Sequence, residues 1–332
     1  MATCGCILLA LFLDALLGEP KRHHPLVIFG NWAQRIETAL NHQQRSGTHV
    51  FRGVLAWVIA VIPLVIFTGL TACLTYQISP WLHGLFAALV LYLAIGWRSL
   101  KEHMLAIYFP LTNNQLPAAR HACSMIVSRN TDTLDETGIA KAAVESTLEN
   151  GSDGIFAALF WFALLGAPGV VLYRLSNTLD AMWGYRTERF ESFGKFAAKT
   201  DDLLNWAPAK ITAWLYIANA FTVKRKAPEQ ETPRQLAQQA IINWKEQAPR
   251  LASPNGGPVM VTGATVLGVK LGGPTRYHGE WLDKPFFGGE ATVEPNDIQR
   301  ALTLIDTTLI GWVAIATVIS ALCLLPLHVF YG

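Results

Sequence analysis

Three carboxylates recur at four-residue intervals just before an apolar stretch of the chain. Glu145, Glu149 and Asp153 lie in the sequence ESTLENGSDG, and the run 155–173 that follows carries no charge. Residues spaced by four share one face of a helix. Grouped carboxylates can take a proton from a reacting group or help to hold a divalent cation. The same spacing is also typical of a solvated, salt-bridged helix face, so the pattern alone leaves both interpretations open.

A second group of polar residues lies between two apolar runs, within 173–210. It mixes acids, arginines and asparagines with aromatic residues. Charges beside membrane segments are costly unless they face the protein interior or a water-filled cavity. Adjacent Asp201 and Asp202 could hold Mg²⁺, which prefers a few carboxylates together with water and substrate oxygens. An adjacent acid pair is a weak motif by itself, and an ordinary polar loop is the alternative.

A third stretch, 253–281, is rich in glycine. Dense glycine allows a ligand to approach the backbone closely, but it is also typical of tight turns. The stretch matches neither the phosphate-binding P-loop nor the dinucleotide fingerprint. Metalloprotease and serine-hydrolase motifs are absent from the sequence, and His24 is interpreted as a loop residue and not a ligand.

Composition indicates a membrane protein. Of 332 residues, 52% are hydrophobic and only 15% are charged, outside the usual balance of soluble domains. A net charge of +2 without a basic block argues against a nucleic-acid partner. The five cysteines are scattered and odd in number, which favours free thiols over a disulfide framework.

Several apolar runs are long enough to cross a bilayer. The runs 54–76, 81–97 and 308–330 are free of charged residues, and about 20 apolar residues span the hydrocarbon core as a helix. The N-terminal stretch 1–18 lacks a basic start, so it is predicted to be a short retained helix.

Two further runs are broken or short. The run 155–173 contains GAPG at 166–169, and 211–223 has only 13 residues between lysines. Irregular backbone at membrane depth is tolerated inside the protein or beside a wet cavity, so both runs are predicted to be re-entrant or interior helices.

The fold class predicted is therefore all-α: a polytopic integral membrane protein with about four spanning helices, re-entrant or interior helices, and polar loops. We expect one membrane-embedded domain over 1–332. Basic residues concentrate in the long loops and not in the connection 77–80, which places the long loops on the cytoplasmic side. The polar stretches expected to carry chemistry are 98–154, 174–210 and 224–306.

Taken together and in order, these stretches resemble the CobD/CbiB membrane proteins of cobalamin biosynthesis, the cobinamide-phosphate synthases. The matching blocks are LDALLGEP with HP, VSRNT followed by AAVESTLENGSDG and ALFW, the whole of 173–213, and SPNGGPVMVTGATVLGVKLGG with Tyr277. The resemblance covers most of the chain, and the combination of blocks is more specific than any acid pair.

The resemblance implies a multi-pass ligase of the inner membrane. Such an enzyme joins (R)-1-aminopropan-2-ol or its O-phosphate to a propionate carboxylate of adenosylcobyric acid, forming an amide. A free carboxylate does not form an amide in water, so the resemblance also implies ATP, which would give an acyl phosphate, and Mg²⁺. The partners implied are the corrinoid, the aminopropanol substrate, the lipid bilayer and other cobalamin-pathway membrane enzymes.

The resemblance and the residue types together predict the site. The acids expected to act in catalysis are Glu145, Asp153, Asp180 and Asp202, and those expected to bind magnesium are Asp201 and Asp202. Charged, amide and hydroxyl groups are expected to bind substrate: Asn150, Arg174, Asn177, Tyr185, Arg186, Asn205, Ser253 and Asn255.

This sequence departs from the family pattern in a few places. Asn130 stands where an aspartate is expected, and Lys199 and Lys210 replace arginines. Lysine keeps the charge but loses the bidentate fork of arginine, so these three positions need not keep the family's roles. None of the departures removes the central acids.

Two other classes of function are open to the same residues. A transporter or channel would use broken helices and membrane-adjacent acids to bind a moving solute, but the clear spans carry almost no charge apart from the N-terminal Asp14. A non-catalytic membrane sensor is the third possibility. A single reaction centre further requires that 155–173 enters and returns, or lies within the protein interior, so that both acid groups lie on the cytoplasmic side.

Overall fold

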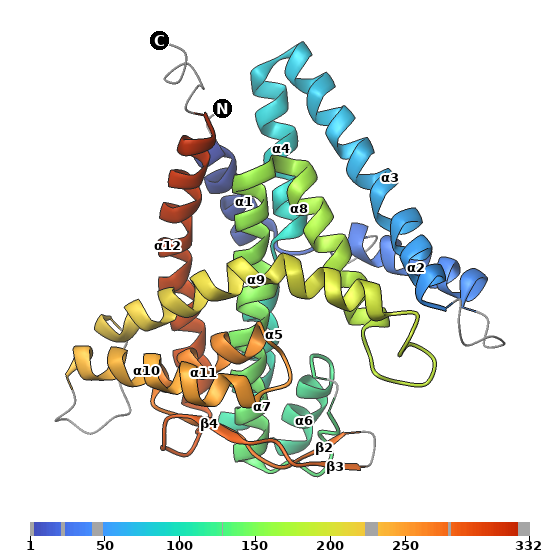
Figure 1. Cartoon of the computed structure of the whole chain (residues 1–332). Helices are drawn as coiled ribbons and strands as arrows, with labels where there is room; N and C mark the ends of the chain where they lie inside the picture. Colours follow the sequence, from blue (N-terminus) through green and yellow to red (C-terminus); the bar gives the residue numbers. More distant parts are fainter. Residues whose placement is uncertain are drawn as a thin grey trace. The chain divides into compact units, whose positions relative to one another are not determined.

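The computed structural model confirms the prediction of a helical membrane protein. It describes residues 3–20, 24–41, 49–127, 129–222, 232–277 and 280–324, and nearly all the elements are helices (Figure 1). Within these residues four helical runs are long and apolar enough to cross a membrane: His49–Ile78, Pro80–Thr112, Glu136–Trp183 and Asn296–Ile319. The last residues of the predicted run 308–330 lie outside the described residues.

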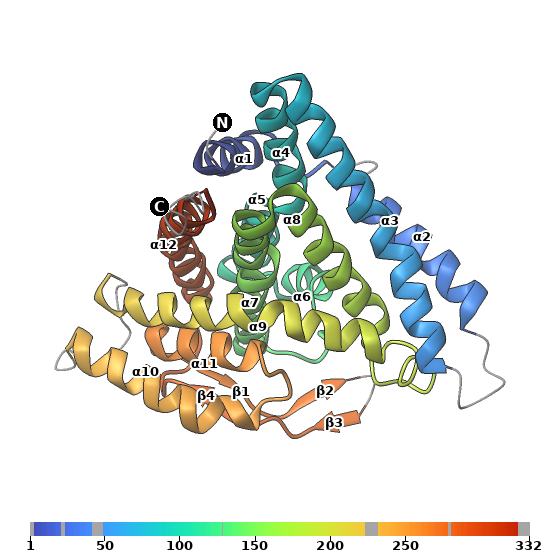
Figure 2. The ribbon, with the colours of Figure 1, turned by 45° about the horizontal axis from the view of Figure 1, so that its top comes forward.

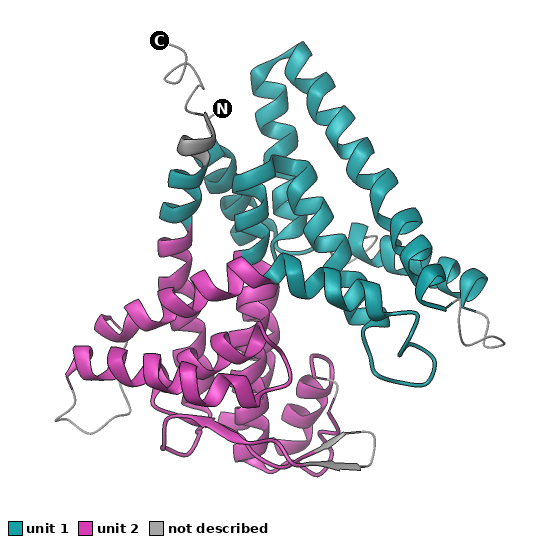
Figure 3. Ribbon diagram, in the orientation of Figure 1, with its two compact units in different colours: residues 1–96, 157–205, 313–332 teal, residues 97–156, 206–312 magenta. Residues whose placement is uncertain are grey.

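The chain divides into two compact units, shown in teal and magenta in Figure 3. Unit 1 comprises residues 1–96, 157–205 and 313–332, and unit 2 comprises residues 97–156 and 206–312. The helices α9 (Lys195–Ala218) and α12 (Asn296–Leu324) each contribute residues to both units. One domain over 1–332 stays a prediction.

Unit 1 is built from helices that pack through small residues. Its elements are α1 (Thr3–Leu17), α2 (Pro25–Leu40), α3 (His49–Ile78), α4 (Pro80–Ala94) and α8 (Ala157–Trp183), with the start of α9. The helix α8 packs against both α3 and α4. A β carbon on Gly53 of α3 would lie 2.0 Å from the Phe193 carbonyl oxygen, so only glycine allows the α8–α9 loop to approach α3 this closely.

The segment predicted to enter and return does reverse its direction. Gly166, inside α8, has φ 66° and ψ −152°, a conformation that is essentially restricted to glycine. A β carbon on Gly169 would lie 2.5 Å from the Trp161 carbonyl oxygen, although eight helical residues would separate these positions by about 12 Å. The chain therefore turns back near Gly166, and α8 is a helical hairpin (Figures 1 and 2). The long apolar run Glu136–Trp183 is not one straight span.

The second ambiguous run, 211–223, is not a separate re-entrant segment. Residues 211–221 form the C-terminal part of α9 and the 3₁₀ turn η2 (Asn219–Phe221), and residue 223 lies outside the described residues. Ala213 and Tyr216 of this part are buried, and Trp214 is 54% exposed. Apolar and aromatic residues therefore lie on both the buried and the exposed side of this part of α9.

Unit 2 combines helices with two short two-stranded sheets. Its helical elements are α5 (Trp97–Thr112), α6 (Leu116–Ser124), α7 (Glu136–Gly151), the π-helical turn η1 (Ser152–Phe156), α10 (Pro233–Gln247), η3 (Ala248–Arg250) and α11 (Gly256–Leu267). The strands β1 (Lys270–Gly272) and β4 (Phe286–Gly288) pair antiparallel, as do β2 (Thr275–Tyr277) and β3 (Glu280–Leu282). The helices α10 and α11 pack side by side in both views (Figures 1 and 2).

The glycine-rich stretch serves helix packing. Its first part forms α11, in which every residue except Met260 is buried. A β carbon on Gly263 would lie 2.6 Å from Leu148 Cδ2 and 3.1 Å from a Tyr216 ring carbon. The glycine thus lets α11 pack tightly against α7 and α9 within unit 2. From the sequence alone, the same glycine-rich stretch could also have been a loop that a ligand approaches closely.

Candidate functional site

Several of the predicted residues of unit 1 form a connected polar network between α8 and α9. Tyr173 Oη donates to Asn205 Oδ1 at 2.9 Å, and Asn205 Nδ2 donates to Asp201 Oδ2 at 3.0 Å. Asn177 Nδ2 donates to Asp201 Oδ1 at 3.2 Å, and Arg174 Nη1 donates to Asn177 Oδ1 at 3.4 Å. We call these five residues the α8–α9 network. It unites four residues that the sequence predicted separately: Arg174, Asn177, Asp201 and Asn205.

Asp201 is the centre of this network. It is buried, and both of its carboxylate oxygens accept a hydrogen bond from an asparagine amide. Burial raises the pKa of Asp201, and the hydrogen bonds from Asn177 and Asn205 offset only part of this rise. The two amides compensate part of the cost of burying this carboxylate.

The neighbouring acids are placed differently. Asp202 is more exposed than Asp201, and burial still raises its pKa. Asp180 of α8 lies close enough to Asp201 and Asp202 for their charges to repel. A β carbon on Gly184 would lie 2.0 Å from Asp180 Oδ1, so the glycine after α8 makes room for this carboxylate. Three acids predicted from the sequence thus meet in one region of unit 1.

A complete metal-binding cage is absent from this region. Among the described residues, no group of three or more histidine, cysteine, aspartate or glutamate side chains is arranged to hold a metal ion. Magnesium usually keeps waters and takes only one or two carboxylates plus substrate oxygens. Asp201 fits even that lesser demand poorly, because both of its oxygens already accept amide hydrogens.

Arg174 and His24 extend the polar region. Arg174 Nε is buried and has no hydrogen-bond partner among the described residues. His24, which is 6% exposed, caps α2, because its Nδ1 accepts a hydrogen bond from Leu26 N at 3.2 Å. His24 Nε2 lies 3.7 Å from Glu19 Oε1. Burial lowers the pKa of His24, the Glu19 charge opposes this, and the Arg174 charge adds to it.

The interpretation of His24 as an ordinary loop histidine missed this arrangement. The signal was the dipeptide His24-Pro25 before a helical pattern, since a capping residue followed by proline is typical of a helix start. His24 and Glu19 belong to the matching block LDALLGEP with HP, but no predicted role had been given to them.

Tyr185 and Arg186 do not join the α8–α9 network. Both are exposed in the loop between α8 and α9, and no hydrogen bond within the described part of the chain connects them to Asp201. The loop is fastened by Arg189, whose Nε and Nη2 donate to Glu37 at 3.0 and 2.6 Å. Glu37 is 3% exposed, so this bidentate pair holds the loop on α2.

In unit 2, both carboxylate oxygens of Glu145 contact other parts of the protein. One oxygen pairs with Arg129, and the other accepts Gly272 N at 2.8 Å. Lys141 Nζ donates to the Gly272 carbonyl oxygen at 3.1 Å. Glu145 is 6% exposed, so the interpretation of α7 as a solvated helix face is wrong. Asp135 caps the start of α7, because its Oδ1 accepts a hydrogen bond from Gly138 N at 2.7 Å.

The start of α11 brings further predicted residues together. Ser253 Oγ accepts Gly256 N at 2.8 Å, and Asn255 is buried. A β carbon on Gly256 would lie 2.7 Å from Glu149 Oε1, so the Glu149 carboxylate sits at this helix end. The unpaired N–H groups and the dipole of a helix N-terminus favour a negative charge there. In this structure the carboxyl group of Glu149 occupies that position.

Asn150 and Asp153 mark the end of α7. Asn150 is exposed and donates to Ser146 Oγ at 2.8 Å. Asp153 lies in the π-helical turn η1, within electrostatic range of Tyr216. Tyr216 Oη donates to the Leu148 carbonyl oxygen at 3.1 Å. Short π-helical turns frequently occur at functional sites, and this one coincides with the motif that the sequence singled out.

Comparison with known proteins gives a consistent result. The family model described as "CobD/Cbib protein" matches residues 7–305. A protein of Stutzerimonas stutzeri named "Cobalamin biosynthesis protein CobD" is 49% identical, covering 89% of this chain and 91% of that protein. The protein of the same name from Chromobacterium violaceum is 44% identical, covering 93% and 94%. One from Rhodobacter capsulatus is 35% identical over 97% and 99%. No solved structure matches this chain.

Proposed function

Because this chain belongs to the CobD/CbiB family, and so has a role in cobalamin biosynthesis, we propose that it is a membrane-bound ligase. The proposed reaction joins (R)-1-aminopropan-2-ol or its O-phosphate to a propionate carboxylate of adenosylcobyric acid. The product is adenosylcobinamide or its phosphate. The inner membrane, with the polar loops on the cytoplasmic side, is the proposed location.

The observation that carries this proposal is the buried Nε of Arg174, a half-buried residue. Its Nε has no partner among the described residues, and a buried donor left unsatisfied costs about 1–3 kcal/mol. Arginine binds carboxylates and phosphates through paired N–H groups, and the proposed substrates carry both kinds of anion. The α8–α9 network holds Arg174 through Asn177, so the guanidinium is positioned before an anion arrives.

The reaction sets demands that the neighbouring acids can meet. The amine nitrogen bonds to the carboxyl carbon, one carboxylate oxygen leaves, and the ammonium group must lose a proton. Bound ATP would supply the phosphoryl group that takes the leaving oxygen, and Mg²⁺ would neutralise phosphate charge. We assign Asp202, with substrate oxygens, to the magnesium and Asp180 to the proton. Asp201 positions Asn177 and Asn205.

An amide-synthesis assay tests the proposal. The protein, reconstituted in nanodiscs, would receive ATP, Mg²⁺, adenosylcobyric acid and either aminopropanol or its phosphate, and the amide product would be followed by mass spectrometry. Arg174→Gln should lose most of the activity, whereas Arg35→Gln, which removes the same charge from an exposed position of α2, should not. Absence of product with both amines, together with corrinoid uptake into proteoliposomes, would instead identify a transporter.

A further inference from the structure

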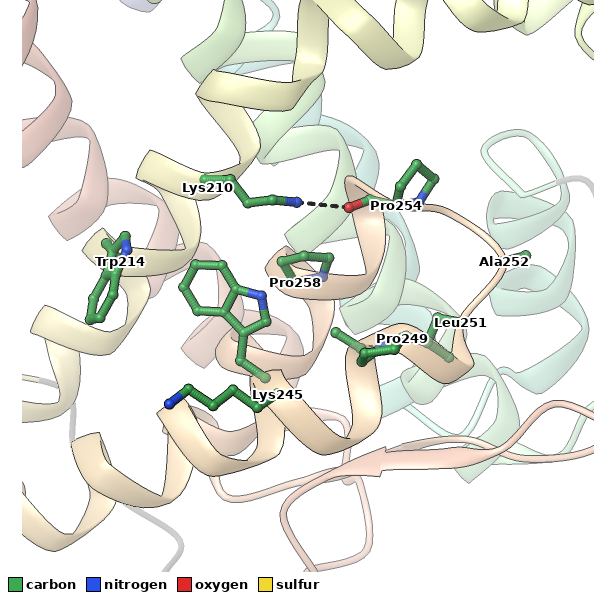
Figure 4. Close-up of a pocket in the computed structure, with 10 residues that line it drawn as sticks. Lys210, Trp214, Lys245, Pro249, Leu251, Ala252, Pro254 and Pro258 are labelled. Atoms are coloured by element: carbon green, nitrogen blue, oxygen red, sulfur yellow. Dashed lines mark hydrogen bonds between the residues drawn. The ribbon is translucent and has the colours of Figure 1, made fainter.

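A pocket in unit 2 has none of the predicted catalytic, metal-binding or substrate-binding residues in its lining, although Pro254 of the lining is the neighbour of Ser253 and Asn255. It has a volume of about 530 Å³ and is lined by α9, α10, η3 and the segment that leads into α11 (Figure 4). Pockets for small ligands typically range over about 300–1,000 Å³. The space is therefore large enough for a headgroup or another molecule of moderate size.

The lining combines aromatic surface with positive charge. Trp214 and Trp244 lie edge to face with ring centroids 5.5 Å apart. Lys210 and Lys245 are the charged residues of the lining, which otherwise consists of alanine, leucine and proline. No acidic side chain is among these lining residues, so the pocket is electrostatically suited to an anion.

Lys210 is held in place at the pocket. Its Nζ donates to the Pro254 carbonyl oxygen at 2.8 Å, as the dashed line in Figure 4 shows. Partial burial lowers the pKa of Lys210, which reflects the cost of keeping an ammonium group against apolar surface. A bound anion would offset this cost.

The pocket opens on an apolar face of α9. Trp206, Lys210 and Trp214 follow one another at intervals of four residues, which places them on one side of the helix. Trp206 is 62% exposed, Trp214 54%, and Phe221 in η2 64%. Tryptophan is enriched where a membrane meets water, because its ring is apolar and its N–H is polar.

We propose that this pocket binds the headgroup of an anionic phospholipid, with Trp206, Trp214 and Phe221 in the boundary between headgroups and acyl chains. A basic pocket between helices is a known type of lipid headgroup site, and the chain already carries helices suited to a bilayer. The helix α9 has 24 residues but is not among the runs apolar enough to span, as expected of a helix that lies along the interface. The proposal does not depend on the reaction assigned above.

Native mass spectrometry of the detergent-purified protein provides the test. Phosphatidylglycerol and phosphatidylcholine would be titrated separately, and the bound fraction measured. The wild type should prefer phosphatidylglycerol. The double variant Lys210→Gln/Lys245→Gln should bind it about 30-fold more weakly, which corresponds to about 2 kcal/mol for two basic residues near an anionic headgroup.

Two further variants serve as controls for lipid binding at the pocket. Lys195→Gln/Arg234→Gln removes the same charge from exposed positions of α9 and α10 outside the pocket and should bind like the wild type. Lys245→Glu alters an exposed side chain, so loss of phosphatidylglycerol there cannot come from misfolding. Equal binding by pocket and control variants would overturn the proposal. Displacement of the lipid by ATP, but not by glycerol 3-phosphate, would reveal a nucleotide site instead.

Discussion

At the scale of single residues, adjacent acids have different environments. Asp201 accepts hydrogen bonds from Asn177 and Asn205 and is 8% exposed, whereas Asp202 is more exposed and stands outside that network. Two neighbouring carboxylates thus have separable roles. One accepts the two asparagine amides, and the other is the acid that we propose to bind magnesium.

Substitution by asparagine should separate these roles. Asp201→Asn places an NH₂ group against an amide donor, so we expect a lower Tm, a loss of about 1–3 kcal/mol in unfolding free energy, and weak activity. Asp202→Asn should keep the wild-type Tm and lose most of the amide synthesis. Thermal unfolding in detergent and the product assay measure both quantities. Near-wild-type turnover in Asp202→Asn would remove this acid from the mechanism.

The proposed role of Asp202 also predicts a dependence on pH. Burial raises the pKa of Asp202 above its usual 3.8, so the carboxylate becomes protonated at a higher pH than a surface aspartate. Because a protonated carboxyl binds Mg²⁺ poorly, activity should fall as the pH falls through this raised pKa. The acid limb of the rate profile should shift to lower pH when the magnesium concentration is increased. An acid limb that is insensitive to magnesium would contradict the assignment.

At the scale of elements, the hairpin α8 depends on one backbone conformation. Gly166 has a φ of 66° with a ψ of −152°, which costs a residue with a β carbon about 1–3 kcal/mol. This reversal of the chain brings Gly169 against Trp161. The hairpin therefore requires a glycine conformation within the GAPG sequence at 166–169.

Gly166→Ala should destabilise unit 1 by about 1–3 kcal/mol through this backbone strain. Gly96→Ala is the matched control, since a β carbon there meets nothing within 4 Å and φ is not positive. Denaturant unfolding of the two variants in the same detergent gives the comparison. If both variants unfold together with the wild type, the turn at Gly166 is not a constrained feature of the protein.

At the scale of the whole molecule, the reversal of α8 bears on membrane topology. A segment that enters and returns leaves the residues before α7 and those after α8 on one side of the bilayer. The connection 77–80 between α3 and α4, which has no basic residue, is expected on the other side.

Cysteine labelling can test this arrangement. The label requires accessible positions, and Glu136, Glu188 and Gln77 are exposed, whereas Ser152 is buried. Single cysteines would be placed at the three exposed positions in a background without native cysteines. Glu136→Cys and Glu188→Cys should react with an impermeant thiol reagent only in inverted vesicles. Gln77→Cys should react in intact cells. Labelling of Glu136→Cys and Glu188→Cys from opposite faces would show that the chain crosses between them.

Much of this protein follows from its sequence alone. The apolar runs determine the spanning helices, because about 20 apolar residues are stable only across a bilayer or in a core. The cap at Asp135 and the break at Gly166 are local, so the residues around them suffice to predict them. The combined blocks also indicated the family, which the comparisons confirmed.

Only the tertiary structure decided which polar residues meet. The spacing of Glu145 on α7 fits a solvated face equally well, and burial against Arg129 and β1 depends on residues far along the chain. Likewise, Asp201 and Asp202 are neighbours in sequence, yet α8 packs its asparagine against only one of them. Helical periodicity determines which side chains share a face, but the partner of that face is set by long-range packing, which no local pattern contains.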